Sequence, residues 1–257
     1  MDPTDFLTQD QMISLTLVSA LLLASGVRRM LDVSGLIAAM AVGLVLSLMG
    51  HWTWLAIMVV FLVLGSIATR WKFEEKRALS IHEGNEGVRG WRNVLANGAA
   101  PSIVAILSWI GDGDWYFLGM ACCASVALSD TLASEIGSLD PRTRSIINLE
   151  AVPPGTNGGM SPTGTFAALS GSLVIAVATV LMLPYSHDGF HHDSTILADA
   201  RGMTFVLITI VGWLGCQVDS ILGALLENEG YIGKHSVNFL ATLSGAMMAF
   251  MAWGRVF

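Results

Sequence analysis

Residues 163–184, TGTFAALSGSLVIAVATVLMLP, form an uncharged run long enough to cross the hydrocarbon core of a bilayer as a helix, which takes about 20 residues. Further apolar runs lie near residues 11–27, 33–50, 52–69, 95–110, 115–136, 202–226 and 236–254. The sequence therefore predicts an all-α, polytopic transmembrane helical bundle of about 8 spans. The stretch LANGAAPSIV (95–104) is polar enough that we expect a broken or partly re-entrant segment there.

The composition of the whole chain agrees with this reading. The 257 residues are 53% hydrophobic with a mean hydropathy of +0.63, and they carry only 13 basic and 20 acidic side chains. A water-soluble globule is excluded by these values, and a β-barrel porin by the lack of strands that alternate apolar and polar residues. Cys122, Cys123 and Cys216 all lie in apolar runs, so we expect small buried hydrophobic residues rather than a disulfide framework or a metal cage.

The distribution of charge predicts how the chain is oriented. The first apolar helix follows an acidic start and precedes Arg28 and Arg29, the reverse of a secretory signal peptide, so we expect it to be retained. With the N-terminus outside, every basic residue except Arg201 and Arg255 falls on the cytoplasmic side, as the positive-inside rule requires. Both termini are therefore predicted to be non-cytoplasmic.

One loop on the non-cytoplasmic side, residues 186–199, is rich in histidine. His187, His191 and His192 with Asp188 and Asp193 lie within it. These residue types can bind a metal, but the loop is predicted to lie far from the other unusual residues. We interpret it as a solvated loop.

The cytoplasmic segments 70–94 and 137–162 are longer than ordinary connections between bundled helices. Together with 227–236 they are the expected active-site loops of a single integral-membrane domain, residues 1–257. Lys72 to Arg77 are expected to form a solvated helix end facing lipid headgroups. Asn93 and Asn97, four residues apart on one helix face, either bond a neighbouring helix or hold a phosphate, a nucleotide or metal-bound water, with Arg92 as a phosphate clamp.

Acidic side chains near the cytoplasmic ends of two predicted spans are the strongest signal of function. Asp130 and Glu135 lie in one span and Asp219 in another, and intramembrane carboxylates are costly enough to indicate a site. Oxygen ligands of this kind suit Mg²⁺. Five residues place Asp130 and Glu135 on different faces of a regular helix, so they converge on one ion only if the helix loosens or other helices contribute.

Between these acids lies a glycine-rich stretch, VPPGTNGGMSPTGT (152–165), directly before an apolar helix. Glycines and a helix N-terminus can cradle a phosphate, although a tight turn explains the same residues. The pattern GxxxxGK[ST] is absent, so this is not a P-loop. Arg142, Arg144 and Lys234 in cytoplasmic loops could supply positive charge to phosphates.

The motifs WRNVLANG (91–98), DTLASEIG (130–137) followed by PRT, VPPGTNGGMSPTGT, and DSILGALLENEGYIGKHSVNF (219–239) together resemble an integral-membrane family. That family includes the plant phytyl-phosphate kinase of vitamin E biosynthesis and many prokaryotic proteins, and it is distantly similar to dolichol kinase and the CTP-dependent cytidylyltransferases. The resemblance covers most of the chain. It departs at the approach to Asp219, where this chain reads GCQVD instead of a Gly-Ser-rich stretch.

The resemblance implies transfer of the γ-phosphoryl group of CTP, or another nucleoside triphosphate, to an isoprenyl monophosphate such as phytyl or geranylgeranyl phosphate. It implies Asp130, Glu135 and Asp219 as catalytic residues that hold Mg²⁺ and nucleotide phosphates. Positioning and charge neutralisation drive such a transfer, so no strong general base is needed. The implied nucleotide- and phosphate-binding residues are Arg92, Asn93, Asn97, Arg142, Arg144, Gly155, Thr156, Asn157, Gly158, Gly159, Ser161, Lys234 and Asn238.

Two other functions stay open at this stage. A lipid-phosphate cytidylyltransferase would use the same residues but join CMP to the lipid and release pyrophosphate. An ion-coupled membrane transporter would use buried acids and irregular backbone as a substrate site. No nucleic-acid motif is present. Gly212, Gly215 and Gly223 permit close helix contact, within one subunit or between the subunits of a homo-oligomer.

Overall fold

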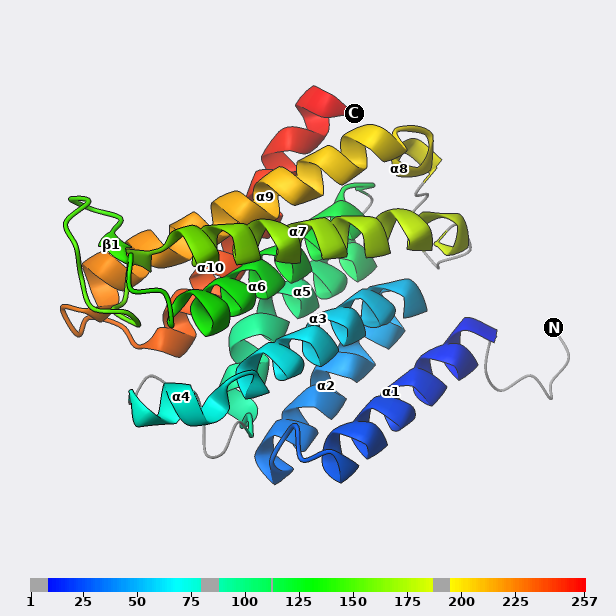
Figure 1. Ribbon diagram of the computed structural model, residues 1–257. Coiled ribbons are helices and arrows are strands. Elements are labelled where there is room, and N and C mark those ends of the chain that lie inside the picture. Colours follow the sequence, from blue (N-terminus) through cyan, green and yellow to red (C-terminus); the bar gives the residue numbers. More distant parts are fainter. Residues whose placement is uncertain (1–8, 80–87, 112, 187–194) are drawn as a thin grey trace, which may run out of the picture.

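The computed structural model describes residues 9–79, 88–111, 113–186 and 195–257, and nearly all of its regular structure is helical (Figure 1). Part of the predicted loop 70–94 and the histidines His187, His191 and His192 lie outside the described residues. The elements in chain order are α1 (Gln9–Val27), α2 (Val33–Met49), α3 (Trp52–Arg70), α4 (Phe73–Ala78), α5 (Trp91–Ile110), α6 (Tyr116–Gly137), β1 (Arg144–Ser145), β2 (Gly159–Met160), α7 (Pro162–Met182), the 3-10 turn η1 (Leu183–Tyr185), α8 (Thr195–Asp199), α9 (Arg201–Leu222), the π-helical turn η2 (Gly223–Glu227) and α10 (Lys234–Val256).

Each predicted span corresponds to a helix. In the described part of the chain, 7 helices are long and apolar enough to cross a membrane, and α2 is a shorter apolar helix of 17 residues. The expected break in the stretch LANGAAPSIV is not present, because α5 runs through it with Pro101 inside. Pro101 cannot donate a backbone hydrogen bond, but the Ser102 hydroxyl donates to the Gly98 carbonyl at 2.7 Å and supports the same turn.

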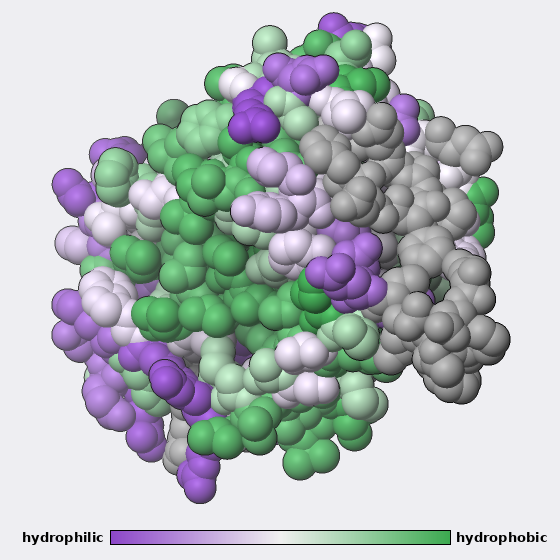
Figure 2. All heavy atoms as spheres, turned by 90° about the vertical axis from the view of Figure 1, so that its right-hand side faces the viewer, coloured by the Kyte–Doolittle hydropathy of each residue, from purple (hydrophilic) through white to green (hydrophobic). Residues whose placement is uncertain are grey.

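Hydrophobic side chains cover much of the outer surface of the bundle. Large apolar residues such as Leu23, Ile37, Ile67, Phe166 and Met247 are each more than half exposed. Figure 2 views the molecule from the end that lies at the right of Figure 1, and hydrophobic residues are broadly visible there, with hydrophilic ones along the left edge. Exposed apolar side chains in this number would promote aggregation in water, whereas hydrocarbon chains solvate them. The exposed faces of these helices are therefore lipid-facing.

Helix α6 forms the centre of the bundle and contacts α3, α5, α7, α9 and α10. Many of its residues are small, and most of them are buried. Close packing against it requires glycine on the neighbouring helices. A Cβ on Gly171 of α7 would lie 3.0 Å from backbone atoms of Leu128 and Ser129, and one on Gly245 of α10 would lie 3.0 Å from the Cys122 carbonyl oxygen.

The bundle has two distinct ends, which Figure 1 shows at its left and right. The β1–β2 hairpin, α4 and the connection from η2 to α10 lie at the left end. The start of α1, α8 and the end of α10 lie toward the other end, so the first and last helices have their outer ends on the same side. Which side faces the cytoplasm stays a prediction from the distribution of basic residues.

Candidate functional site

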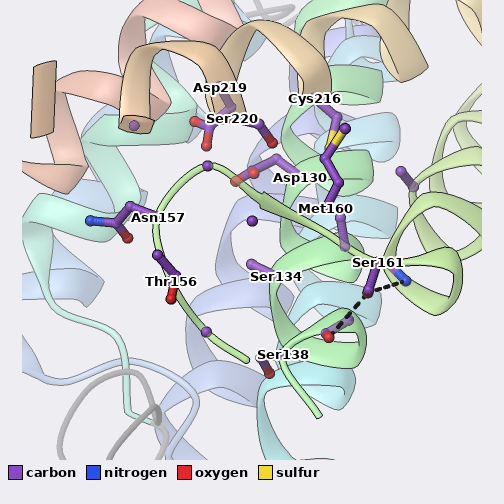
Figure 3. Close-up of a pocket in the computed structure, with 18 of the residues that line it drawn as sticks. Asp130, Ser134, Ser138, Thr156, Asn157, Met160, Ser161, Cys216, Asp219 and Ser220 are labelled. Carbon is purple, nitrogen blue, oxygen red and sulfur yellow. Dashed lines mark hydrogen bonds between the residues drawn. The ribbon is translucent and has the colours of Figure 1, made fainter. Parts of the chain in front are cut away.

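A polar pocket opens at the end of the bundle that carries the β1–β2 hairpin (Figures 1 and 3). It lies between α6, the start of α7, α9 with η2, the start of α10, and the glycine-rich loop. Its volume, including the opening to solvent, is about 1010 Å³. The polar side chains that line it are Asp130, Ser134, Glu135, Ser138, Thr143, Thr156, Asn157, Ser161, Thr165, Gln217, Asp219, Ser220, Glu227, Lys234 and Asn238.

Asp130 of α6 and Asp219 of α9 lie next to each other in this pocket, beside the glycine-rich loop (Figure 3). Asn238 of α10 donates from Nδ2 to Oδ2 of Asp130 at 3.4 Å. The Oδ1 atom of Asp219 is buried and has no hydrogen-bond partner in the structure. Two adjacent carboxylates with an unsatisfied oxygen between helices are unfavourable unless they share a proton or a metal cation joins them.

This pair fits a magnesium ion. Mg²⁺ is usually held by one or two carboxylates together with waters and substrate phosphates, so Asp130 and Asp219 would provide the protein ligands. Among the described residues, no group of three or more His, Cys, Asp and Glu side chains is arranged to hold a metal. Phosphates and waters would therefore complete the coordination.

The glycine-rich loop is held close to α9 by its own backbone geometry. Strands β1 and β2 pair Arg144 with Met160 and Ser145 with Gly159, and the Ile146 amide donates to the Gly158 carbonyl at 2.9 Å. Gly158 has a φ of 74°, and a Cβ on it would lie 2.5 Å from the Cβ of Ala224 in η2. Only glycine fits this crossing, because any other side chain would both strain the backbone and collide with η2.

Two helix N-termini open onto the pocket. Ser161 caps α7 by accepting a hydrogen bond from the Gly164 amide at 3.1 Å, and its hydroxyl donates to the Gly137 carbonyl at the end of α6. Helix α10 begins at Lys234, whose side chain lines the pocket. The partial positive charge at each N-terminus attracts anions. The pocket thus combines these two positive ends and Lys234 with the two carboxylates.

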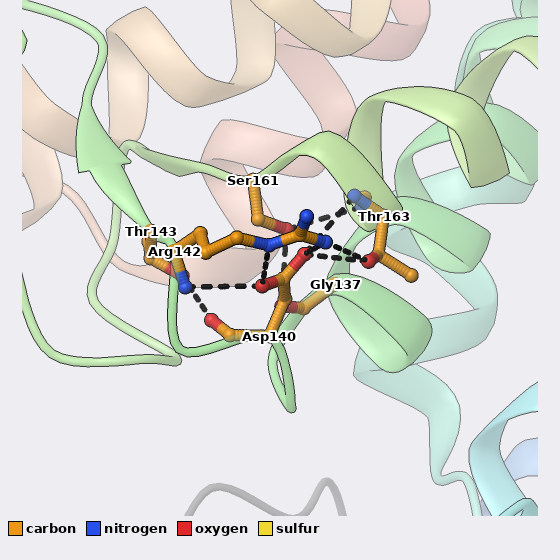
Figure 4. Close-up of polar contacts among 7 residues, drawn as sticks. Gly137, Asp140, Arg142, Thr143, Ser161 and Thr163 are labelled. Atoms are coloured by element: carbon orange, nitrogen blue, oxygen red, sulfur yellow. Dashed lines mark hydrogen bonds and ion pairs between the residues drawn. The ribbon is translucent and has the colours of Figure 1, made fainter.

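Outside the pocket, polar contacts fix the segment at Asp140 and Arg142, just before β1, to the start of α7 (Figure 4). Arg142 donates from Nε and Nη2 to the Asp140 carboxylate at 3.0 and 2.9 Å, and the Thr163 hydroxyl and amide donate to the same carboxylate. The Arg142 guanidinium, followed by the Thr163 hydroxyl, holds the pKa of Asp140 well below its usual range. The guanidinium of Arg142, although exposed, is therefore engaged in holding this segment against α7.

Of the predicted site residues, the structure brings together in this pocket Asp130, Asp219, Gly155 to Gly159, Ser161, Lys234 and Asn238. Arg142 lies just before β1 and Arg144 lies in it; neither lines the pocket, and the Arg144 side chain donates to the Leu149 carbonyl. Arg92, Asn93 and Asn97 lie at the start of α5, away from this pocket. The Asn97 amide donates to the Asn93 carbonyl within the same helix.

Glu135 lines the pocket, but its carboxylate is held by Lys76. The Nζ atom of Lys76 lies 2.6 Å from Oε2 of Glu135 and also donates to the carbonyls of Ala68 and Thr69. Lys76 is completely buried, so the expected solvated helix end is wrong at this position. Glu135 therefore lies apart from the Asp130–Asp219 pair. Nothing in the sequence distinguishes Lys76 from its exposed neighbours, because α4 is too short to display a periodicity.

Most of the chain is similar to known proteins. A sequence model of a family described as integral membrane protein DUF92 matches residues 16–246. An uncharacterized membrane protein of Methanocaldococcus jannaschii is 29% identical over 94% of this chain and 93% of its own length. Two Arabidopsis thaliana proteins are also similar: chloroplastic protein VTE6, 33% identical over 57% of this chain and 46% of its own, and protein PGR, 26% identical over 79% and 74%. No solved structure matches.

Proposed function

The chain belongs to the integral membrane protein family DUF92, and from this premise we propose that it is a membrane kinase that transfers the γ-phosphoryl group of CTP, or of another nucleoside triphosphate, to an isoprenyl monophosphate. The observation that supports this most directly is the facing pair Asp130 and Asp219, with Lys234 and the glycine-rich loop around it. The motifs that resemble the phytyl-phosphate kinase family, and the similarity to protein VTE6, support the choice of lipid.

In the proposed reaction, a phosphate oxygen of the lipid attacks the γ-phosphorus, and the bond from that phosphorus to the β,γ-bridging oxygen breaks. The products are the isoprenyl diphosphate and the nucleoside diphosphate. The acceptor oxygen is already anionic, so no residue must remove a proton from it. The protein's task is to align two anions and to offset their charge.

Each part of the pocket has a role in that alignment. Lys234 and the N-termini of α7 and α10 offset the negative charge of the phosphates. The loop at Gly155 to Gly159 lets backbone amides approach them closely. Asp130 and Asp219 would hold Mg²⁺, which neutralises charge on the phosphate oxygens. Asn238 orients Asp130 through its hydrogen bond.

The label position in the product tests this proposal. Purified protein is incubated with geranylgeranyl monophosphate, Mg²⁺ and CTP labelled at either the γ- or the α-phosphorus. The proposed kinase puts γ-label into the lipid, and chelating Mg²⁺ abolishes the transfer. Appearance of α-label with release of pyrophosphate would instead establish a cytidylyltransferase, which the same pocket could serve.

A transporter would give no label from any nucleotide. The position of the pocket, at one end of the bundle rather than at its middle, favours an enzyme that meets a soluble nucleotide there. An absence of label from folded protein would reject both enzymes and favour transport.

A further inference from the structure

A second, apolar groove lies between α1, α2, α3 and α5. Its volume, counting the opening to solvent, is about 540 Å³. Side chains such as Leu21, Val42, Met58 and Leu62 line it. Among the residues that line it, Arg89 is charged and Asn93 is polar.

The guanidinium of Arg89 is buried and has no anionic partner among the described residues, which leave out residues 80–87. The residue is 6% exposed, its Nε atom has no hydrogen-bond partner, and its Nη2 atom donates to the Thr69 hydroxyl at 2.8 Å. Within the described parts of the chain, no carboxylate lies within ion-pair distance of it. A buried cation of this kind is costly unless an anion joins it.

The backbone around Arg89 is firmly held. The Arg89 amide donates to the Met30 carbonyl and the Asp32 amide donates to the Arg89 carbonyl, each at 3.1 Å. Asp32 also caps α2 by accepting from the Gly35 amide at 2.8 Å. A Cβ on Gly35 would lie 2.5 Å from the Arg89 carbonyl oxygen, so α2 presses directly on this segment. The groove therefore has a fixed cation beside an apolar lining.

Polar contacts connect Arg89 with the wall of the Asp130 pocket. Thr69 accepts from Arg89 through its hydroxyl and from Lys76 through its carbonyl, and Lys76 pairs with Glu135, which lines that pocket. The Cβ position of Gly65 is 3.2 Å from Nη1 of Arg89 and 3.4 Å from Cγ2 of Thr131. Thr131 directly follows Asp130 in α6. The charged part of the groove thus lies next to the helix that carries the proposed catalytic acid.

We propose that this groove receives the apolar chain of the lipid acceptor, with Arg89 facing its phosphate at the side nearest α6. An apolar channel with one buried cation matches an amphiphile that has a single hydrocarbon chain and an anionic head. The identification of that amphiphile as an isoprenyl monophosphate rests on the proposed function. The location of the binding site rests on Arg89 and the groove.

Photocrosslinking tests the location without requiring turnover. The full-length protein in nanodiscs is labelled with a geranylgeranyl monophosphate probe that carries a diazirine in its chain, and the modified peptides are identified by mass spectrometry. We expect labels on the groove-lining residues of α1, α2, α3 and α5, and competition by geranylgeranyl monophosphate. Labels confined to other helices would overturn the proposal, and so would competition by phosphatidylglycerol alone, which would mean that the groove holds a bilayer phospholipid.

Paired variants test the role of the groove in the reaction. Leu62→Trp fills it, whereas Val63→Trp places the same side chain on the outer face of α3, where Val63 is 40% exposed. Arg89→Gln removes the buried charge, and Arg77→Gln removes an exposed one on α4. Leu62→Trp and Arg89→Gln should raise the KM for the lipid at least about tenfold and leave the KM for CTP unchanged. Arg89→Lys should restore part of the loss.

The outcomes separate the two proposals. If the probe labels the groove but no phosphorus leaves CTP, the proposed kinase fails and the groove stands as a lipid-phosphate site. If γ-phosphorus is transferred with unchanged KM values in Leu62→Trp and the groove is not labelled, the groove proposal fails and the kinase stands. Unchanged elution from size exclusion confirms that each variant is folded.

Discussion

Replacing Lys76 with methionine should strongly destabilise the protein. The Lys76–Glu135 pair is buried, with the two side chains 0% and 4% exposed and 2.6 Å between Nζ and Oε2. Lys76→Met keeps the length of the side chain but leaves the Glu135 carboxylate buried without its cation, and the Oε1 atom of Glu135 already has no partner. Removal of one member of a buried ion pair costs about 3–5 kcal/mol, so we expect a loss of this size in the free energy of unfolding.

The double variant Lys76→Met/Glu135→Leu should recover most of that loss, because no unpaired charge remains. The coupling energy from the double-mutant cycle should then exceed about 2 kcal/mol. Unfolding by sodium dodecyl sulfate in mixed micelles, followed by circular dichroism, measures all members of the cycle. The matched control is Lys72 and Glu75, which form an ion pair at 2.9 Å with 44% and 57% exposure. Its coupling should stay below about 1 kcal/mol. Equal coupling in the two cycles would refute the reasoning.

Three further predictions concern the pocket and its loop. Asp219→Asn should lower phosphoryl transfer at least about 100-fold without lowering the unfolding temperature, since it removes one of two adjacent carboxylates; a fully active variant would contradict the metal assignment. Gly158→Ala should lower both activity and thermal stability because its Cβ meets Ala224, whereas Gly202→Ala, where nothing lies within 4 Å of the added Cβ, should change neither. The pKa of Asp140 is depressed in the folded state. The Asp140 carboxylate therefore contributes fully to the free energy of unfolding above the unfolded pKa of about 4, and this contribution is lost as the pH falls toward the folded pKa. The stability difference between wild type and Asp140→Asn, measured by thermal unfolding from neutral to acidic pH, should therefore narrow only below about pH 4; a difference that narrows near neutral pH would contradict this.

The spans could be predicted from the sequence because the thickness of a bilayer sets a length that hydropathy reveals. Hydropathy and helix length also predict which polar residues lie near the same face of the membrane. They do not predict on which side of the bundle each of these residues lies. Asn93 and Asn97 were predicted to join the acids, yet α5 begins beside α2 and the apolar groove. The order in which helices pack around α6 depends on side-chain shape at many contacts, which no local motif expresses.

A local sequence pattern was sufficient to predict a feature that depends only on the backbone of one loop. The glycines at 155–159 indicated a close backbone approach, and Gly158 does cross η2 at a distance that only glycine permits. The partner of Glu135 was missed because Lys76 lies 59 residues earlier in the chain, in a segment that reads as solvated. The spacing of Asp130 and Glu135 already argued against their convergence, and in the structure Glu135 faces Lys76 instead.

The burial of α6 has a consequence for how the protein is made. Its sequence contains Ser125, Ser129, Asp130, Ser134 and Glu135, so lipid is a poor solvent for it until other helices surround it. Helices α7, α9 and α10, which supply most of that surrounding, are synthesised later. A nascent chain released after α6 would present its polar side chains to hydrocarbon or to the quality-control machinery of the membrane. Assembly of the centre therefore waits for the last helix to leave the ribosome, which makes the C-terminal third of the chain decisive for biogenesis.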